Sequence, residues 1–83
     1  MTRKLPFECI VYDEGETVQN PFSGESIALP ADAVAVYDVI MGYNMTAENT
    51  TDLKQRDKYY SVVRKGLDWF RKHEPEGYMV LLD

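Results

Sequence analysis

The chain carries one cysteine and one histidine, Cys9 and His73, the residue types that could form a thiolate nucleophile with its base. The pair would work only if an N-terminal strand packed beside the end of a late helix. A buried cysteine in a strand and an exposed histidine at a helix C-terminus account for both residues without chemistry. We therefore expect no catalytic residue and a non-enzymatic protein.

Metal chemistry has equally little support in the sequence. Asp13, Glu14 and Glu16 could bind Ca²⁺, but the twelve-residue calcium-loop pattern is absent and a solvated turn is expected. One cysteine and one histidine cannot supply a four-ligand zinc site, and the sequence contains no glycine-rich phosphate loop or nucleophile elbow. The sequence predicts no metal and no cofactor.

With 83 residues, the chain has the length of a single domain, residues 1–83. The β-branched and aromatic run at 7–12 predicts a first strand, and residues 17–29 predict a short irregular hairpin with a turn at 20–25. A helix is expected from Pro30 to Asn44, because proline suits a first helical turn. This helix is apolar nearly all round, which predicts burial on more than one side or a subunit contact.

A second helix is expected from Asp52 to His73, after a connector at 46–50 and with Thr51 as N-cap. The apolar run at 78–82 predicts a C-terminal strand paired with the first strand. The predicted fold is therefore α+β, with a small sheet packed against an antiparallel two-helix hairpin. The sheet would combine an N-terminal strand or irregular hairpin with the C-terminal strand. The alternative is a mainly α-helical hairpin with an extended N-terminal arm.

The second helix has a regular apolar stripe at three- and four-residue spacing, and it includes Leu53, Tyr60, Val63, Leu67 and Phe70. Arg56 falls within this stripe. It could pair with Asp32 or Asp38 of the first helix as a partly buried ion pair. Alternatively, its stem covers apolar surface while its charge stays at the rim.

Charge is unevenly distributed along the chain. The net charge of −5 combines −6 over residues 1–50 with +1 over residues 51–83, and the helix at 52–73 alone carries +4. An acidic chain argues against non-specific binding of nucleic acid, since phosphate contacts depend on lysine and arginine. The basic helix nevertheless leaves a basic binding face possible.

The basic helix carries the candidate binding residues. Lys58, Lys65 and Lys72 form a ridge at seven-residue spacing, and Val62 and Trp69 lie beside it on the helical wheel. A tryptophan next to lysines has the composition of a contact surface, where the ring buries area and the lysines select an acidic partner. In the alternative interpretation, Trp69 packs against the N-terminal hairpin.

Residues 20–25, Asn-Pro-Phe-Ser-Gly-Glu, precede Leu29 and a helix bearing Ala33, Ala35, Tyr37 and Asp38. This stretch of about twenty residues resembles short bacteriophage proteins of unknown function, including those of phages of marine cyanobacteria. The resemblance implies a small accessory protein in a host cytoplasm, and it implies no activity or site residue. Some endocytic adaptor domains in eukaryotes recognise the tripeptide Asn-Pro-Phe, which occurs here at Asn20-Pro21-Phe22. Asparagine and proline are also typical turn residues, which accounts for the tripeptide without such recognition.

These observations favour a small protein-interaction or accessory protein that associates with itself or with a host or viral protein. A nucleic-acid-binding module using helix 52–73 is the alternative, and an acidic DNA mimic is a further one. No run of apolar residues reaches the length of a membrane span, and no signal peptide is recognised at the N-terminus. With a single cysteine, the expected location is a reducing cytoplasm.

Overall fold

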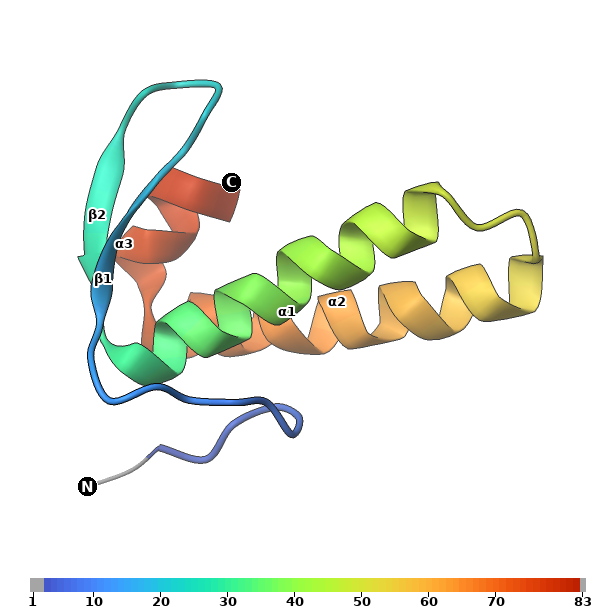
Figure 1. Ribbon diagram of the computed structural model, residues 1–83, viewed down its shortest axis with the longest axis horizontal. Helices are drawn as coiled ribbons and strands as arrows, with labels where there is room; N and C mark the ends of the chain where they lie inside the picture. The colour runs from blue at the N-terminus through green and yellow to red at the C-terminus, as the bar shows by residue number, and fades with distance from the viewer. Residues whose placement is uncertain (1–2, 83) are drawn as a thin grey trace.

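The computed structural model describes residues 3–82. A two-stranded hairpin stands at one end of two long antiparallel helices, and a short helical segment at the C-terminal end of the chain packs beside the hairpin (Figure 1). The elements are β1 (Glu16–Gln19), β2 (Ser26–Leu29), α1 (Ala31–Glu48), α2 (Leu53–His73), α3 (Pro75–Gly77) and the π-helix η1 (Tyr78–Leu82). The predicted α+β class with a helical hairpin is confirmed.

The strands β1 and β2 pair antiparallel, with Glu16 opposite Leu29 and Gln19 opposite Ser26. The Asn20 side chain closes the turn between them, because its Oδ1 accepts a hydrogen bond from the backbone N–H of Phe22 at 2.8 Å. Gly24 has φ = 79°, a left-handed conformation that favours glycine. Local turn chemistry thus builds the predicted hairpin.

Helix α1 is buried on several sides in its first half, as its apolar composition predicts. Four consecutive residues, 33–36, are all buried there. The helix runs four residues beyond its predicted end at Asn44. Side chains of the expected connector support the extra turn, since Thr46 Oγ1 donates to the Gly42 carbonyl and Thr50 Oγ1 to the Thr46 carbonyl. The N-cap of α2 is Asp52, not Thr51, and its carboxylate accepts from the Lys54 N–H at 2.9 Å.

The core lies where α1 and α2 pack closest to the rest of the chain. Phe70 and Val36 are fully buried, and Ile40 of α1 faces Gly66 of α2. A Cβ on Gly66 would lie 2.5 Å from Ile40 Cγ1, so the glycine permits the close approach of the two helices. Helix α2 also buries Trp69, and β2 contributes Leu29.

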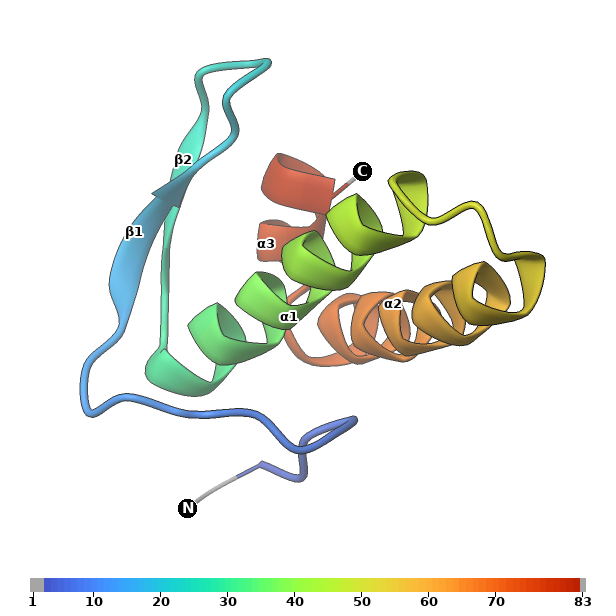
Figure 2. The same ribbon diagram turned by 45° about the vertical axis from the view of Figure 1, so that its right-hand side comes forward.

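The strand predicted at 7–12 is absent. This segment runs below the helices without a ladder partner (Figures 1 and 2). Phe7 and Cys9 pack against the core, whereas Glu8 and Ile10 are exposed, so the chain keeps the alternation of an extended segment. The prediction of a strand was wrong because the expected partner at the C-terminal end is not a strand.

The strand predicted at 78–82 is also wrong, because these residues form the helical segment η1. A short apolar run does not distinguish a buried strand from a buried helical turn. Pro75 starts a helix at its first position, and the backbone continues from it through Tyr78, whose N–H donates to the Glu74 carbonyl at 2.9 Å. Leu81 is thereby buried in the core.

Within residues 3–82, none of the helices is both long and apolar enough to cross a membrane.

Candidate interaction site

An open groove of about 460 Å³ lies between residues 3–6, which we call the N-terminal segment, and the C-terminal half of α2. Leu5, Pro6 and Trp69 supply its apolar surface. Its polar lining is mostly basic and comprises Lys4, Lys65, Lys72, His73 and Asp68. Asp68 is ion-paired with Arg71, so the lysines dominate the local charge. We call this site the lysine groove.

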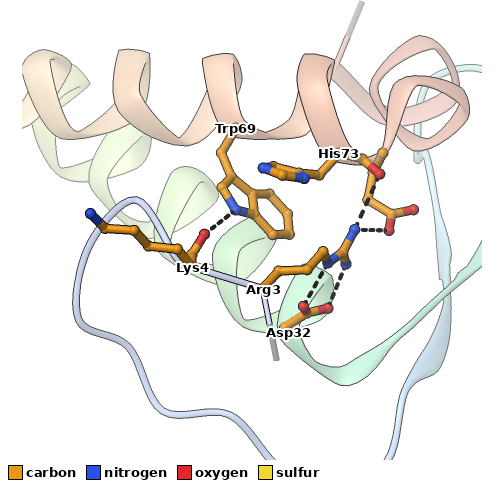
Figure 3. Close-up of polar contacts among 6 residues, drawn as sticks. Arg3, Lys4, Asp32, Trp69 and His73 are labelled. Atoms are coloured by element: carbon orange, nitrogen blue, oxygen red, sulfur yellow. Dashed lines mark hydrogen bonds and ion pairs between the residues drawn. The ribbon is translucent and has the colours of Figure 1, made fainter. Parts of the chain in front are cut away.

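Trp69 is 6% exposed and forms part of the groove surface. Its indole Nε1 donates a hydrogen bond to the Lys4 carbonyl at 2.8 Å, which fixes the N-terminal segment against α2 (Figure 3). The Arg3 guanidinium lies 4.7 Å from the ring centroid, and the His73 ring centroid lies 5.1 Å away. Trp69 is therefore buried, as the alternative interpretation of the sequence has it, but its hydrogen bond and cation–π contact are with Arg3 and Lys4 rather than with the predicted hairpin.

Arg3 holds the N-terminal segment in place. Its Nε and Nη2 donate to the two carboxylate oxygens of Asp32 at 2.9 and 2.6 Å (Figure 3). Its Nη1 lies 2.8 Å from Glu74 Oε2 and donates to the His73 carbonyl at 3.1 Å. A single side chain thus ties the N-terminal segment to the start of α1 and the end of α2. We call this set of contacts the Arg3 clamp.

The Arg3 clamp shifts the titration of both partners. Hydrogen bonding from Arg3 is the main cause that lowers the pKa of Asp32 below its usual range. Hydrogen bonding to Asp32 raises the pKa of Arg3, with a further contribution from Glu74. The pair is therefore charged at neutral pH, and it keeps Lys4, Leu5 and Pro6 beside α2.

Only part of the predicted contact surface on α2 lines the groove. Lys65, Trp69 and Lys72 line the lysine groove, whereas Lys58 and Val62 do not. Lys58 is exposed and Val62 is half-buried. Sequence analysis missed the groove residues Lys4, Leu5 and Pro6. No helical spacing indicates them, because they are more than sixty residues away from Trp69 in the sequence and meet the groove residues of α2 only in the folded chain.

Cys9 and His73, the two residues that could have formed a nucleophile and its base, line different cavities. His73 lines the lysine groove, whereas Cys9 lines a second hollow with Ala35 and Val39 of α1. Burial raises the pKa of the Cys9 thiol, with a contribution from the charge of Asp32, and both effects disfavour the thiolate. Across residues 3–82, no group of three or more histidine, cysteine, aspartate or glutamate side chains is placed to hold a metal ion.

Arg56 does not pair with Asp32 or Asp38 as one prediction had it, because the helices are antiparallel and Arg56 near the start of α2 lies at the other end of the hairpin from the start of α1. Instead, Arg56 Nη2 donates to the Thr50 carbonyl at 2.9 Å, which ties α2 to the loop that precedes it. Arg56 is half-buried, in agreement with a position at the rim of the apolar stripe.

Comparison of the chain with protein-family models, with curated proteins and with solved structures finds no match.

Proposed function

We propose that the protein is a non-enzymatic interaction module that associates with further copies of itself through the lysine groove. The observation that carries this proposal is a basic groove in a chain that is acidic as a whole. Lys4, Lys65 and Lys72 line the apolar groove, whereas the chain carries a net charge of −5. Opposite charges of this kind favour association between copies and select its orientation.

A binding role also fits the exposed apolar surface. Among residues 3–82, nine large apolar side chains are exposed, including Tyr12, Phe22 and Met79. Scattered apolar residues are ordinary on a protein surface, but a chain this small has few elements left to cover them. Separation of Cys9 from His73 supports a non-enzymatic role, since no other nucleophile and base pair was recognised in the sequence.

Nucleic-acid binding is the second candidate, because Lys4, Lys65 and Lys72 lie around one groove. Single-stranded nucleic acids are held by bases that stack on exposed aromatic rings. Trp69 cannot provide such a platform, since it is buried and Arg3 lies over its ring. We therefore expect no binding of a labelled single strand in fluorescence anisotropy at low salt, where the electrostatic attraction is strongest.

We place this role in a reducing cytoplasm, as the lone cysteine suggests. The resemblance to phage proteins supports an accessory role inside a host cell, and a host or viral protein is the further partner to consider.

Sedimentation velocity at tens of micromolar protein tests self-association. We expect the wild type to associate and Lys65→Glu to weaken association by about tenfold or more, because the substitution places a carboxylate in the groove. Lys54→Glu makes the same change of charge on the same helix outside the groove, and we expect it to retain association. A wild type that stays monomeric overturns the proposal. If both variants lose association equally, the groove is not the contact surface.

A further inference from the structure

Phe22 is the most exposed large apolar side chain of the described residues, with 97% of its surface accessible. It lies in the turn between β1 and β2, which projects away from the helices (Figure 2). An aromatic side chain with no intramolecular cover contributes nothing to the core. Aromatic residues are, however, frequent anchors in protein interfaces, where each buries a large area.

The turn holds Phe22 in an ordered position. Asn20 Oδ1 accepts from the N–H groups of Phe22 and Ser23, and Asn20 Nδ2 donates to the Val80 carbonyl at 2.9 Å. Two backbone hydrogen bonds, Asn20 to Glu25 and Gly24 to Asn20, close the same loop. A side chain presented by a preorganised loop loses less conformational entropy when it binds.

The lysine groove matches this loop in apolar character and in charge. Its apolar surface of Leu5, Pro6 and Trp69 suits a phenyl ring, and its volume falls within the range of about 300–1,000 Å³ typical of binding clefts. Glu25 follows Phe22 by three residues and is exposed. Its carboxylate is therefore available to the lysines around the groove.

We propose that Phe22 of one copy inserts into the lysine groove of a second copy, with Glu25 of the inserting loop facing Lys65 and Lys72. This inference rests on the proposed self-association and names its anchor. The occupant is a second copy because the same chain supplies an uncovered aromatic anchor, a neighbouring carboxylate and a groove of opposite charge.

The loop cannot fill its own groove. The tip of the hairpin projects from one side of the molecule, and the N-terminal segment that borders the groove lies along the opposite side (Figures 1 and 2). The contact is therefore heterologous, with anchor and groove at different places on each copy. Heterologous contacts continue from copy to copy and produce rings or open chains.

Two variants and their mixture test this arrangement by sedimentation velocity. Phe22→Ala keeps the groove and loses the anchor, whereas Lys65→Glu keeps the anchor and damages the groove. We expect each variant alone to lose about tenfold or more in association. A mixture of the two can form one intact contact per pair, so it should produce a one-to-one complex that grows no further. Leu53→Ala removes another exposed apolar side chain, outside the proposed contact, and should associate like the wild type.

The fluorescence of Trp69 reports on occupation of the groove, because Trp69 is the sole tryptophan of the chain. Its emission should change with the concentration of the wild type and stay constant for Phe22→Ala. The fold of this variant should be unaffected, as Phe22 is almost fully exposed. Circular dichroism and a thermal melt check that expectation.

The possible results separate the two proposals. If the wild type and Phe22→Ala associate equally, Phe22 is not the anchor, although self-association stands. If both variants are impaired and their mixture stays monomeric, the pairing of this anchor with this groove is wrong. If the wild type is monomeric, both proposals fail.

Discussion

The two ends of the helical hairpin are held together in different ways. The near end, residues 31–40 and 63–73, contains most of the core, including Val36, Trp69 and Phe70. At the far end, residues 41–62, Ala47 alone is buried. Met45 and Leu53 there are 65% and 72% exposed.

The contrast follows from where the rest of the chain can reach. The N-terminal segment, β2 and the C-terminal helical segment all pack beside the near end (Figure 1). At the far end, the two helices have only each other and a short loop. Local hydrogen bonds secure that loop, such as the bond that Asn49 Nδ2 donates to the Met45 carbonyl. The rings of Tyr43 and Tyr59 also pack there, with their centroids 5.6 Å apart.

The stability of the domain should therefore be concentrated at the near end, whereas local opening should begin at the far end. The groove of the proposed contact depends on the near end, because Trp69 and the N-terminal segment form it. Changes at the far end should leave association intact, and this separates structural effects from interface effects.

The largest loss of stability is expected from Phe70→Ala. Phe70 is fully buried, in contact with the rings of Tyr37 and Trp69. Removing a buried phenyl ring leaves a cavity and typically costs about 3–5 kcal/mol. Urea denaturation followed by circular dichroism measures the free energy of unfolding. If the variant is too unstable to fold, the milder Phe70→Leu should still unfold at lower urea than the wild type.

Leu53→Ala is the matched change at the far end, and we expect it to alter the free energy of unfolding by less than about 0.5 kcal/mol. A loss comparable to that of Phe70→Ala would show that the far end contributes as much to the free energy of unfolding as the near end.

An intermediate loss is expected from breaking the Arg3 clamp. Arg3→Ala removes the hydrogen bonds to Asp32 and His73 and the ion pair with Glu74. The groups remain partly exposed to solvent, so we expect a loss of about 1–3 kcal/mol. The same variant should loosen the N-terminal segment over Trp69, and a red shift of the tryptophan emission would report this.

The Arg3 clamp also gives a pH dependence with a defined sign. The pKa of Asp32 is lower in the folded state than its ordinary value of 3.8, mainly because of hydrogen bonding from Arg3. Its contribution to stability is therefore complete above pH 3.8 and is lost as the pH falls through the folded pKa. Asp32→Asn should reduce this part of the acid sensitivity. Equal slopes of stability against pH for both proteins would contradict the assignment.

The sequence predicted the helical hairpin well because its signals are local. Pro30 and Asp52 mark helix starts, and Pro75 ends α2. The errors occur where tertiary contacts decide the conformation. Residues 78–82 are apolar enough for a strand, yet the helical start at Pro75 and packing of Leu81 in the core make them helical.

The candidate site was predictable only in the part that lies on one helix. Seven-residue spacing brought Lys65 and Lys72 beside Trp69, and these residues do share a groove. The opposite wall comes from Lys4, Leu5 and Pro6, which the Arg3 clamp and the Trp69 hydrogen bond hold there. Such long-range contacts leave no periodic pattern in the sequence.

Small effects of opposite sign are expected at two helical glycines. Gly66→Ala places a methyl group against buried Ile40 at the near end, and we expect a net loss of about 1 kcal/mol because overpacking outweighs the gain in helix propensity. Gly42→Ala lies in open space at the far end, and it should gain about 0.5–1 kcal/mol from helix propensity alone. Urea denaturation of both variants measures the difference. If Gly66→Ala also stabilised the protein, Ile40 would have room to move and the near end would be less tightly packed than its burial implies.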